Sequence, residues 1–172
     1  LFEMSRDEIF AMKTRGRDIC FKCLSAGVPN WYNNNFLPPD LQKFHTPTYC
    51  YIDTGSGFSE KQLLLLYFHP KISEARLHIK FDVRNYQRIN SVRWDPVEGN
   101  FCHVKIDKIE IEMINGRVKP VSLSELKMNG NRISEEEFKF LTPDPWIIIP
   151  VEETDVAGIR IDGKLILMEN KF

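Results

Sequence analysis

Apolar and polar residues alternate in short runs from Tyr49 to Met168, and turn residues separate these runs at roughly even spacing. Alternation is typical of strands with one buried face, and regularly spaced short strands are typical of a β-sandwich. The pattern therefore predicts an all-β, antiparallel β-sandwich. The predicted strands are Tyr49–Ile52, Gln62–His69, Ala75–Val83, Ile89–Trp94, Phe101–Ile114, Trp146–Val151, Gly158–Ile161 and Lys164–Met168.

The longest run changes phase along its length. Val104 and Ile106 occupy even positions, whereas Ile109 and Ile111 occupy odd ones. A shift of one residue turns a strand's side chains to the opposite face, unless an extra residue is inserted as a β-bulge. We therefore predict a β-bulge near Asp107–Lys108.

Three other segments have specific predictions. Leu63–Phe68 is apolar on both faces, which predicts a strand covered on both sides, with the N-terminal segment as one cover. Asp162-Gly163 stands between two apolar runs, and this dipeptide is a strong signal for a two-residue hairpin. Leu123–Met128 and Ser134–Phe138 are predicted to form short helical turns.

The residues before Tyr49 have a different pattern. Apolar residues within Ser5–Cys23 lie among charged ones, and Ser5 and Glu8 have the spacing of a capping box, which predicts a helix. Ala26–Thr48 is rich in proline and asparagine and suits neither helix nor strand. We therefore divide the chain into an N-terminal helix and connector, residues 1–48, and a β-sandwich domain, residues 49–172.

Charge and targeting signals restrict the classes of partner and the cellular compartment that the sequence supports. The chain of 172 residues has 23 basic and 24 acidic residues, so its net charge of -1 does not favour binding to nucleic acid or to an anionic membrane. No apolar run has the length of a membrane span, and the start of the chain lacks the pattern of a secretory signal. Four cysteines without any glycosylation sequon favour a reducing compartment, so we expect a cytoplasmic protein.

Motifs for catalysis and metal binding are weak. Cys20 and Cys23 have the spacing of a metal knuckle or redox pair, but no second pair of ligands follows, so we interpret them as two simple thiols at the end of a helix. The Gly-Ser-Gly sequence at 55–57 suits a turn, and the acidic runs Glu152-Glu153 and Glu135–Glu137 suit solvated loops. The sequence therefore predicts no catalytic residue, no metal ligand and no cofactor.

Aromatic residues form 12% of the chain, more than a small core requires. Trp94 is in phase with the apolar Val92, so we predict that it packs in the core. Other aromatic residues lie in turns or connectors, where a ring could stack on a sugar; these candidates are Trp31, Tyr32, Tyr86 and Trp146. For Trp31 we favour the other explanation, in which the ring pins the connector onto the sandwich.

Polar residues near the predicted strand ends complete the candidate ligand set: Asp53, Arg93, Asp95 and Asp144. Arg93 and Asp95 share the face opposite to Trp94, either as an exposed pair of small energetic value or as a buried pair that fixes the turn at Pro96. The three aspartates and backbone carbonyls could also hold a structural calcium ion, although no ligand spacing requires one.

Three blocks of sequence resemble a known accessory module. They are Tyr51–Glu60 (YIDTGSGFSE), Val92–Glu98 (VRWDPVE) leading into Cys102–Ile111 (CHVKIDKIEI), and Phe140–Ile147 (FLTPDPWI). Together they are similar to the accessory β-sandwich of bacterial glycosyltransferases and methyltransferases that build surface polysaccharide. The resemblance spans about Tyr49 to Met168. It implies a jelly-roll-like fold of carbohydrate-binding type, attached to a catalytic domain elsewhere in the parent chain.

The sequence therefore predicts a non-catalytic module that binds or positions glycan for an attached glycosyltransferase. Two alternatives remain open. The first is a protein-interaction or scaffolding module, including self-association as a homo-oligomer, and the second is a glycan-modifying enzyme that uses a carboxylate pair.

Overall fold

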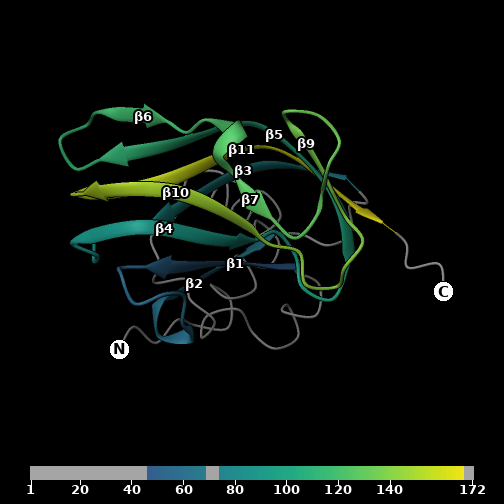
Figure 1. Ribbon diagram of the computed structural model, residues 1–172, viewed down its shortest axis with the longest axis horizontal. Helices are drawn as coiled ribbons and strands as arrows, with labels where there is room; N and C mark the ends of the chain where they lie inside the picture. Colours follow the sequence, from purple (N-terminus) through teal and green to yellow (C-terminus); the bar gives the residue numbers. More distant parts are fainter. Residues whose placement is uncertain (1–45, 69–73, 169–172) are drawn as a thin grey trace, which may run out of the picture.

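The computed structural model describes residues 46–68 and 74–168, which form two antiparallel β-sheets (Figure 1). Two short 3-10 helices, η2 (Glu60–Gln62) and η3 (Leu123–Glu125), lie in the connections. The prediction of an all-β antiparallel sandwich is confirmed. The strands are β1 (Thr46–Asp53), β2 (Leu63–Phe68), β3 (Glu74–Asp82), β4 (Arg88–Asp95), β5 (Phe101–Met113), β6 (Val118–Pro120), β7 (Lys127–Met128), β8 (Asn131–Arg132), β9 (Glu137–Phe140), β10 (Ile147–Thr154) and β11 (Val156–Met168).

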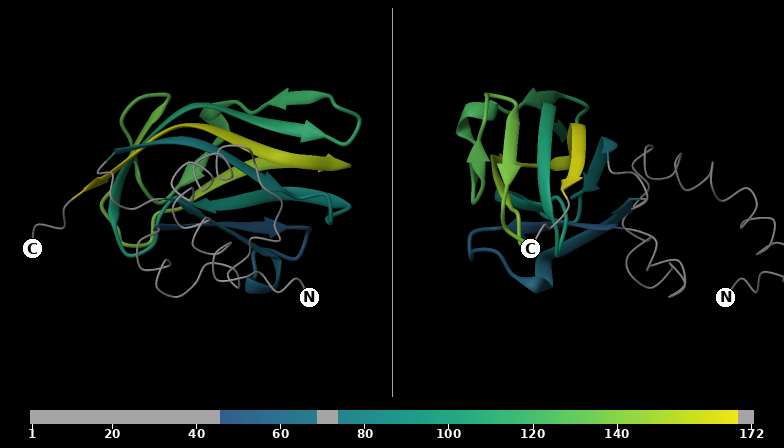
Figure 2. Two further views of the ribbon diagram at one scale, coloured as in Figure 1. Left: turned by 180° about the vertical axis from the view of Figure 1, so that it is seen from behind. Right: turned by 90° about the vertical axis from the view of Figure 1, so that its right-hand side faces the viewer.

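The two sheets have separate strand orders. Sheet A has the order β2-β1-β4-β10-β7, and its strands β1, β4 and β10 can be followed side by side in Figure 1. Sheet B has the order β3-β11-β5-β9-β8, and β6 adds to it by pairing with β5. The view from behind in Figure 2 shows the long strands running along the long axis of the molecule.

The strand order is that of a jelly roll whose chain order is cyclically shifted. From β2 onwards the longer strands are distributed between the sheets as in a jelly roll, with β2, β4 and β10 in sheet A and β3, β5, β9 and β11 in sheet B, and β11 returns to lie between β3 and β5. The place between β2 and β4, which the last strand of a jelly roll fills, is here filled by β1. Strand β1 is thus a central strand of sheet A, paired with β2 and β4 on its two sides.

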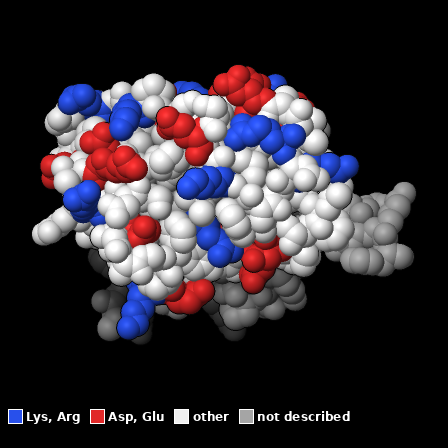
Figure 3. Space-filling model, viewed as in Figure 1, with Lys and Arg blue, Asp and Glu red and all other residues white. Residues whose placement is uncertain are grey.

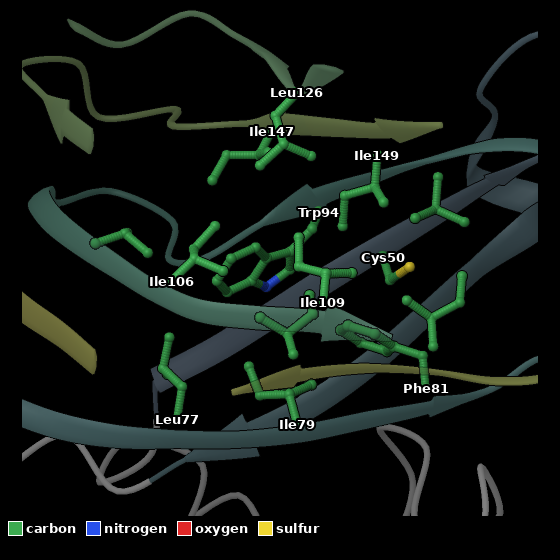
Figure 4. Close-up of a cluster of buried hydrophobic side chains, with 14 of the residues drawn as sticks. Cys50, Leu77, Ile79, Phe81, Trp94, Ile106, Ile109, Leu126, Ile147 and Ile149 are labelled. Atoms are coloured by element: carbon green, nitrogen blue, oxygen red, sulfur yellow. The ribbon is translucent and has the colours of Figure 1, made fainter. Parts of the chain in front are cut away.

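The core lies between the sheets and contains side chains from nearly every long strand (Figure 4). Trp94 is fully buried in it, which confirms the prediction from its phase. The indole Nε1 donates a hydrogen bond to Thr48 Oγ1 at 2.8 Å, and that hydroxyl donates to the Asp95 carbonyl at 3.0 Å. Because the indole N–H has a partner, burial of this large ring leaves no unpaired donor.

The predicted bulge is present in β5. Asp162 of β11 faces Lys108 and Gly163 faces Ile106, so Asp107 has no partner on β11. The core-facing side chains on both sides of the bulge are buried, as the phase change requires.

The hairpin predicted at Asp162-Gly163 is wrong, because both residues lie inside the continuous strand β11. A Cβ atom on Gly163 would lie 2.1 Å from the Lys105 carbonyl oxygen. Glycine is therefore required here for the close approach of β5 at its bulge, and not for a turn.

Other local predictions have mixed outcomes. Leu123–Glu125 is helical, as predicted for the start of that segment, whereas Ser134–Phe138 is not a helical turn. Its end belongs to β9, where Phe138 and Phe140 alternate into the core. In β2 the adjacent Leu64 and Leu65 are both buried, so this strand is covered on both faces at that point.

Several predictions concern residues outside the described part of the chain. These are the helix at Ser5–Cys23, the cysteine pair Cys20 and Cys23, and the aromatic candidates Trp31 and Tyr32. Strand β1 begins at Thr46, three residues before the boundary proposed at 48/49.

Candidate functional site

A hollow of about 670 Å³ lies on the outer face of sheet A. Cys50 and Ile52 of β1 are fully buried, so their neighbours Tyr49 and Tyr51 point to the outer face. The strand register places Tyr49 opposite Asp95 and Tyr51 opposite Arg93. The hollow is lined by Tyr49, Tyr51, Phe58, Ser59, Glu60, Arg93, Asp95, Val97, Glu98 and Asp144.

Arg93 occupies the middle of this group of side chains. Its Nε and Nη2 atoms donate to the two carboxylate oxygens of Asp95 at 2.8 and 2.9 Å. Nη2 also donates to Asp144 Oδ1 at 3.2 Å. The Asp95 side chain is 6% exposed and that of Arg93 28%, so the second of the two possibilities for this pair, a buried pair, is the one present.

Two aromatic rings flank the guanidinium of Arg93. Its Cζ atom lies 5.4 Å from the centre of the Tyr51 ring and 5.9 Å from that of Trp146. Both distances are within the range of cation–π attraction. The ion pair and the rings together hold a flat cationic group and two aromatic surfaces on one sheet face.

The loop between β1 and β2 forms one wall of the hollow. Asp53 Oδ1 accepts hydrogen bonds from the backbone N–H groups of Gly55 at 2.7 Å and Gly57 at 2.9 Å. Both glycines have positive φ, which confirms the turn predicted at 55–57. This folded loop brings Phe58 and Glu60 to the hollow. Asp53 therefore acts here by positioning the wall.

The opposite wall is held by Asn129. Its Nδ2 donates to the Asp144 carbonyl at 2.6 Å, and its Oδ1 accepts from the Trp146 N–H at 2.9 Å. The N–H of Gly99 donates to the Pro143 carbonyl at 2.8 Å, which ties the β4–β5 connection to the same segment. These bonds fix Asp144 and Trp146 beside Arg93.

Burial changes the acid–base behaviour of the hollow. Burial raises the pKa of Asp95 to about 6; the bond to Arg93 opposes this shift, and the neighbouring Asp144 and Glu98 add to it. Burial alone would lower the pKa of Arg93, but its bonds to Asp95 raise it, so Arg93 stays charged and Asp95 is the group that titrates. Burial, followed by the nearby Glu60, raises the pKa of Tyr51 to about 12, which keeps this phenol protonated.

The structure brings together four of the predicted ligand residues: Arg93, Asp95 and Asp144 line the hollow, and Trp146 lies beside Arg93 but outside the lining. Tyr86 instead packs partly against the core and does not line the hollow. Tyr49 and Tyr51 were missed, although their alternation with buried Cys50 and Ile52 would have placed them on the outer face. Asn129 was also missed, and no local sequence signal distinguishes it from the other loop amides.

The three aspartates suggested for calcium have other hydrogen-bond partners. Asp53 accepts from loop N–H groups, and Asp95 and Asp144 both accept from Arg93. Within residues 46–68 and 74–168, no group of three histidine, cysteine or carboxylate side chains is arranged to hold a metal ion. What the hollow offers is therefore aromatic surface, hydroxyl groups and carboxylates around one paired guanidinium.

Comparisons with known proteins give no match: no family model fits the chain, and neither a curated protein nor a solved structure is significantly similar to it. In the described part of the chain, no helix is long and apolar enough to cross a membrane.

Proposed function

We propose that the hollow on sheet A is the glycan-binding site of a non-catalytic module. The observation behind this proposal is the Tyr51 ring in the lining and the Trp146 ring next to the hollow, both within cation–π distance of a carboxylate-bound Arg93. Aromatic faces bind the C–H surface of a sugar, and nearby fixed polar groups bind its hydroxyls. A volume of about 670 Å³ is within the range of ordinary ligand sites.

The polar groups of the hollow suit sugar hydroxyls because they include both donors and acceptors. Tyr49 Oη donates to Glu98 Oε2 at 2.8 Å, which fixes a phenol and a carboxylate side by side in the lining. The exposed Asp144 carboxylate, whose side chain is 67% exposed, can accept from hydroxyl groups. Because these groups already hold one another in place, binding would require little additional ordering of side chains.

The position of Arg93 favours binding over hydrolysis. A glycosidase holds its substrate bond in the space between two carboxyl groups. Here Asp95 and Asp144 both accept from the same Nη2 atom, so the guanidinium fills the space between them. For this reason we propose binding rather than hydrolysis.

The outer face of sheet B supports the choice of sheet A. Its charged side chains pair with one another across β3, β11 and β5: Lys80 and Arg160 bind Glu112, Lys108 lies 3.0 Å from Glu110 and 3.5 Å from Asp162, and His78 also binds Asp162. Such mutual pairing leaves few groups for a ligand. The aromatic rings beside Arg93 give sheet A the more suitable surface.

The resemblance described above also supports a place for this module in an enzyme of glycan synthesis, where it would bind or position glycan for an attached glycosyltransferase in the cytoplasm. The protein-interaction alternative has less support. The exposed large apolar side chains of the described residues come from several different elements: Phe58, Ile114, Ile133 and Leu141 lie in connections, and Val118 lies in β6. They do not suggest one docking surface.

Glycan binding can be tested with an array of oligosaccharides, followed by titration calorimetry at millimolar sugar. We expect Tyr51→Ala and Trp146→Ala each to weaken binding by about tenfold, equivalent to ~1.4 kcal/mol, because each removes a stacking surface. Ile114→Ala is the control, since it truncates an exposed apolar side chain on the β5–β6 hairpin. Absence of binding to every oligosaccharide by the folded protein would exclude this function.

A further inference from the structure

We propose that the hollow selects neutral sugars and amino sugars and excludes anionic sugars such as uronic acids. This inference rests on the proposed glycan-binding function and names the charge class of the ligand. It derives from two observations: acidic side chains are in excess around Arg93, and the hydrogen-bond donors of Arg93 are already bonded to carboxylates of the protein.

Acidic residues outnumber basic ones in the described lining of the hollow. Among the residues that the structure describes, Arg93 is the one basic residue that lines it, whereas Glu60, Asp95, Glu98 and Asp144 are acidic. A site that recognises a sugar carboxylate normally presents arginine or lysine donors in excess of its own acids. In this hollow the acidic side chains are in excess of the basic one, and they remain so when Asp95 is protonated.

The charge of Arg93 is already matched within the protein. Asp95 binds its Nε and Nη2 atoms in the two-pronged geometry that a ligand carboxylate would need, and Asp144 binds Nη2 as well. An anionic sugar would have to displace Asp95, whose side chain is 6% exposed. That displacement would leave a buried carboxylate without its partner, which is costly.

An ammonium group on the sugar would be attracted by the carboxylates of the hollow. Asp144 and Glu98 are carboxylates in the described lining, and the Asp144 side chain is 67% exposed. Opposite charges a few ångströms apart attract, and this attraction is partly screened at an exposed site. Neutral sugars avoid both effects, so the expected order of affinity is amino sugar, neutral sugar and then uronic acid.

The test uses matched oligosaccharides of glucose, glucosamine and glucuronic acid, and the corresponding galactose series. Within each series the ring stereochemistry is constant. The amino sugar has an ammonium group in place of the C2 hydroxyl and the uronic acid has a carboxylate in place of the C6 hydroxymethyl group, so the salt dependence is what separates charge from the loss of a hydroxyl. We expect the uronic acid to bind about tenfold or more weakly than the neutral sugar at low ionic strength, and the difference to shrink in 0.5 M salt, because screening reduces repulsion.

Two variants connect the selectivity to named carboxylates. Asp144→Asn and Glu98→Gln keep the size of the side chain and remove one negative charge, so each should reduce the discrimination against uronic acid about threefold. Glu135→Gln makes the same change of charge at an exposed position in the β8–β9 connection and should leave the discrimination unchanged.

The outcomes separate the two proposals. Equal or tighter binding of the uronic acids, or unchanged discrimination in both variants, would overturn the charge selection and leave the glycan site intact. Failure of all the oligosaccharides to bind the folded protein would overturn the glycan site itself.

Discussion

Arg93 and Asp95 illustrate how a single pair of side chains can define a surface. They lie two residues apart on β4 and face outward because Trp94 between them faces the core. Their mutual hydrogen bonds compensate only in part for the loss of water around Asp95, and the rings of Tyr51 and Trp146 lie within cation–π distance of the guanidinium. Removal of Arg93 would leave the Asp95 carboxylate buried and unpaired, whereas removal of Asp95 would leave Arg93 partly exposed and still bonded to Asp144.

This pair predicts a specific dependence of stability on pH. The pKa of Asp95 is about 6 in the folded protein against an ordinary value of 3.8, so the folded state holds the proton more tightly than the unfolded state. The resulting stabilisation is complete below about pH 4 and is lost as the pH rises through about 6, a change of at most about 3 kcal/mol. Asp95→Asn cannot lose this proton. Its free energy of unfolding relative to the unsubstituted protein should therefore increase from pH 4 to pH 6, as measured by urea denaturation.

Asp144→Asn is the matched control for this measurement. It removes a carboxylate from the same guanidinium, but from a side chain that is 67% exposed. We expect its unfolding curve to keep most of the pH dependence of the unsubstituted protein. Parallel pH curves for Asp95→Asn and the unsubstituted protein would show that the burial of Asp95 does not affect its titration.

At this scale the sequence predicted the residue types of the site better than their assembly. Arg93 and Asp95 were placed on one face from the alternation along β4 alone. The sequence could not show that Asp144 and Trp146 would join them, because that contact depends on Asn129 and on the β4–β5 connection. It also could not distinguish Tyr86, which lies in a turn and is nevertheless half-buried.

Strands β5 and β11 show how one extra residue is accommodated within a sheet. The phase change in β5 predicted the bulge correctly, because both halves of the strand must direct apolar side chains to the same core. The same bulge explains why the Asp162-Gly163 dipeptide is not a turn. The Asp-Gly dipeptide predicts a turn because glycine can adopt backbone torsion angles that turns require. At Gly163, however, glycine is needed for space, because β5, a strand distant in sequence, approaches closely.

Gly163→Ala tests the role of this close approach. The new Cβ would lie 2.1 Å from the Lys105 carbonyl oxygen and 3.1 Å from the Ile106 Cα, so the backbones of β5 and β11 must separate. We expect the free energy of unfolding to fall by about 3 kcal/mol, at the upper end of the range for an overpacked site. The measurement is chemical denaturation followed by tryptophan fluorescence.

Lys164→Ala is the control for Gly163→Ala, because it changes the next residue of β11 at a position that already has a Cβ. Its effect should be under about 1 kcal/mol, as is usual for a partly exposed position. An equally small effect of Gly163→Ala would mean that the bulge opens easily and that glycine is not required there.

The cyclic shift of strand order is a property of the whole molecule that alternation along single strands could not predict. Alternation identified most of the long strands, but it contains no information on which strands are neighbours. The decisive pairing is that of β1 with both β2 and β4, which inserts the first described strand into the middle of sheet A. The two halves of the sheet are joined through this strand, and the Tyr49 and Tyr51 side chains of the hollow come from it.

A circular permutant tests this topology. Opening the chain between Gly57 and Phe58, with Phe172 joined to Leu1, moves β1 to the end of the chain and restores the ordinary jelly-roll order while keeping every residue. The strand pairings do not depend on the order of connection, so we expect the permutant to fold, with Trp94 in the same buried environment. Near-ultraviolet circular dichroism and urea denaturation measure both expectations.

A second permutant opened inside β5, between Ile109 and Glu110, should fail to fold cooperatively, because it interrupts the strand that pairs with β11 and β9. If the first permutant were as disordered as the second, the position of β1 would depend on its order in the chain, and the jelly-roll description would not account for how this sandwich forms.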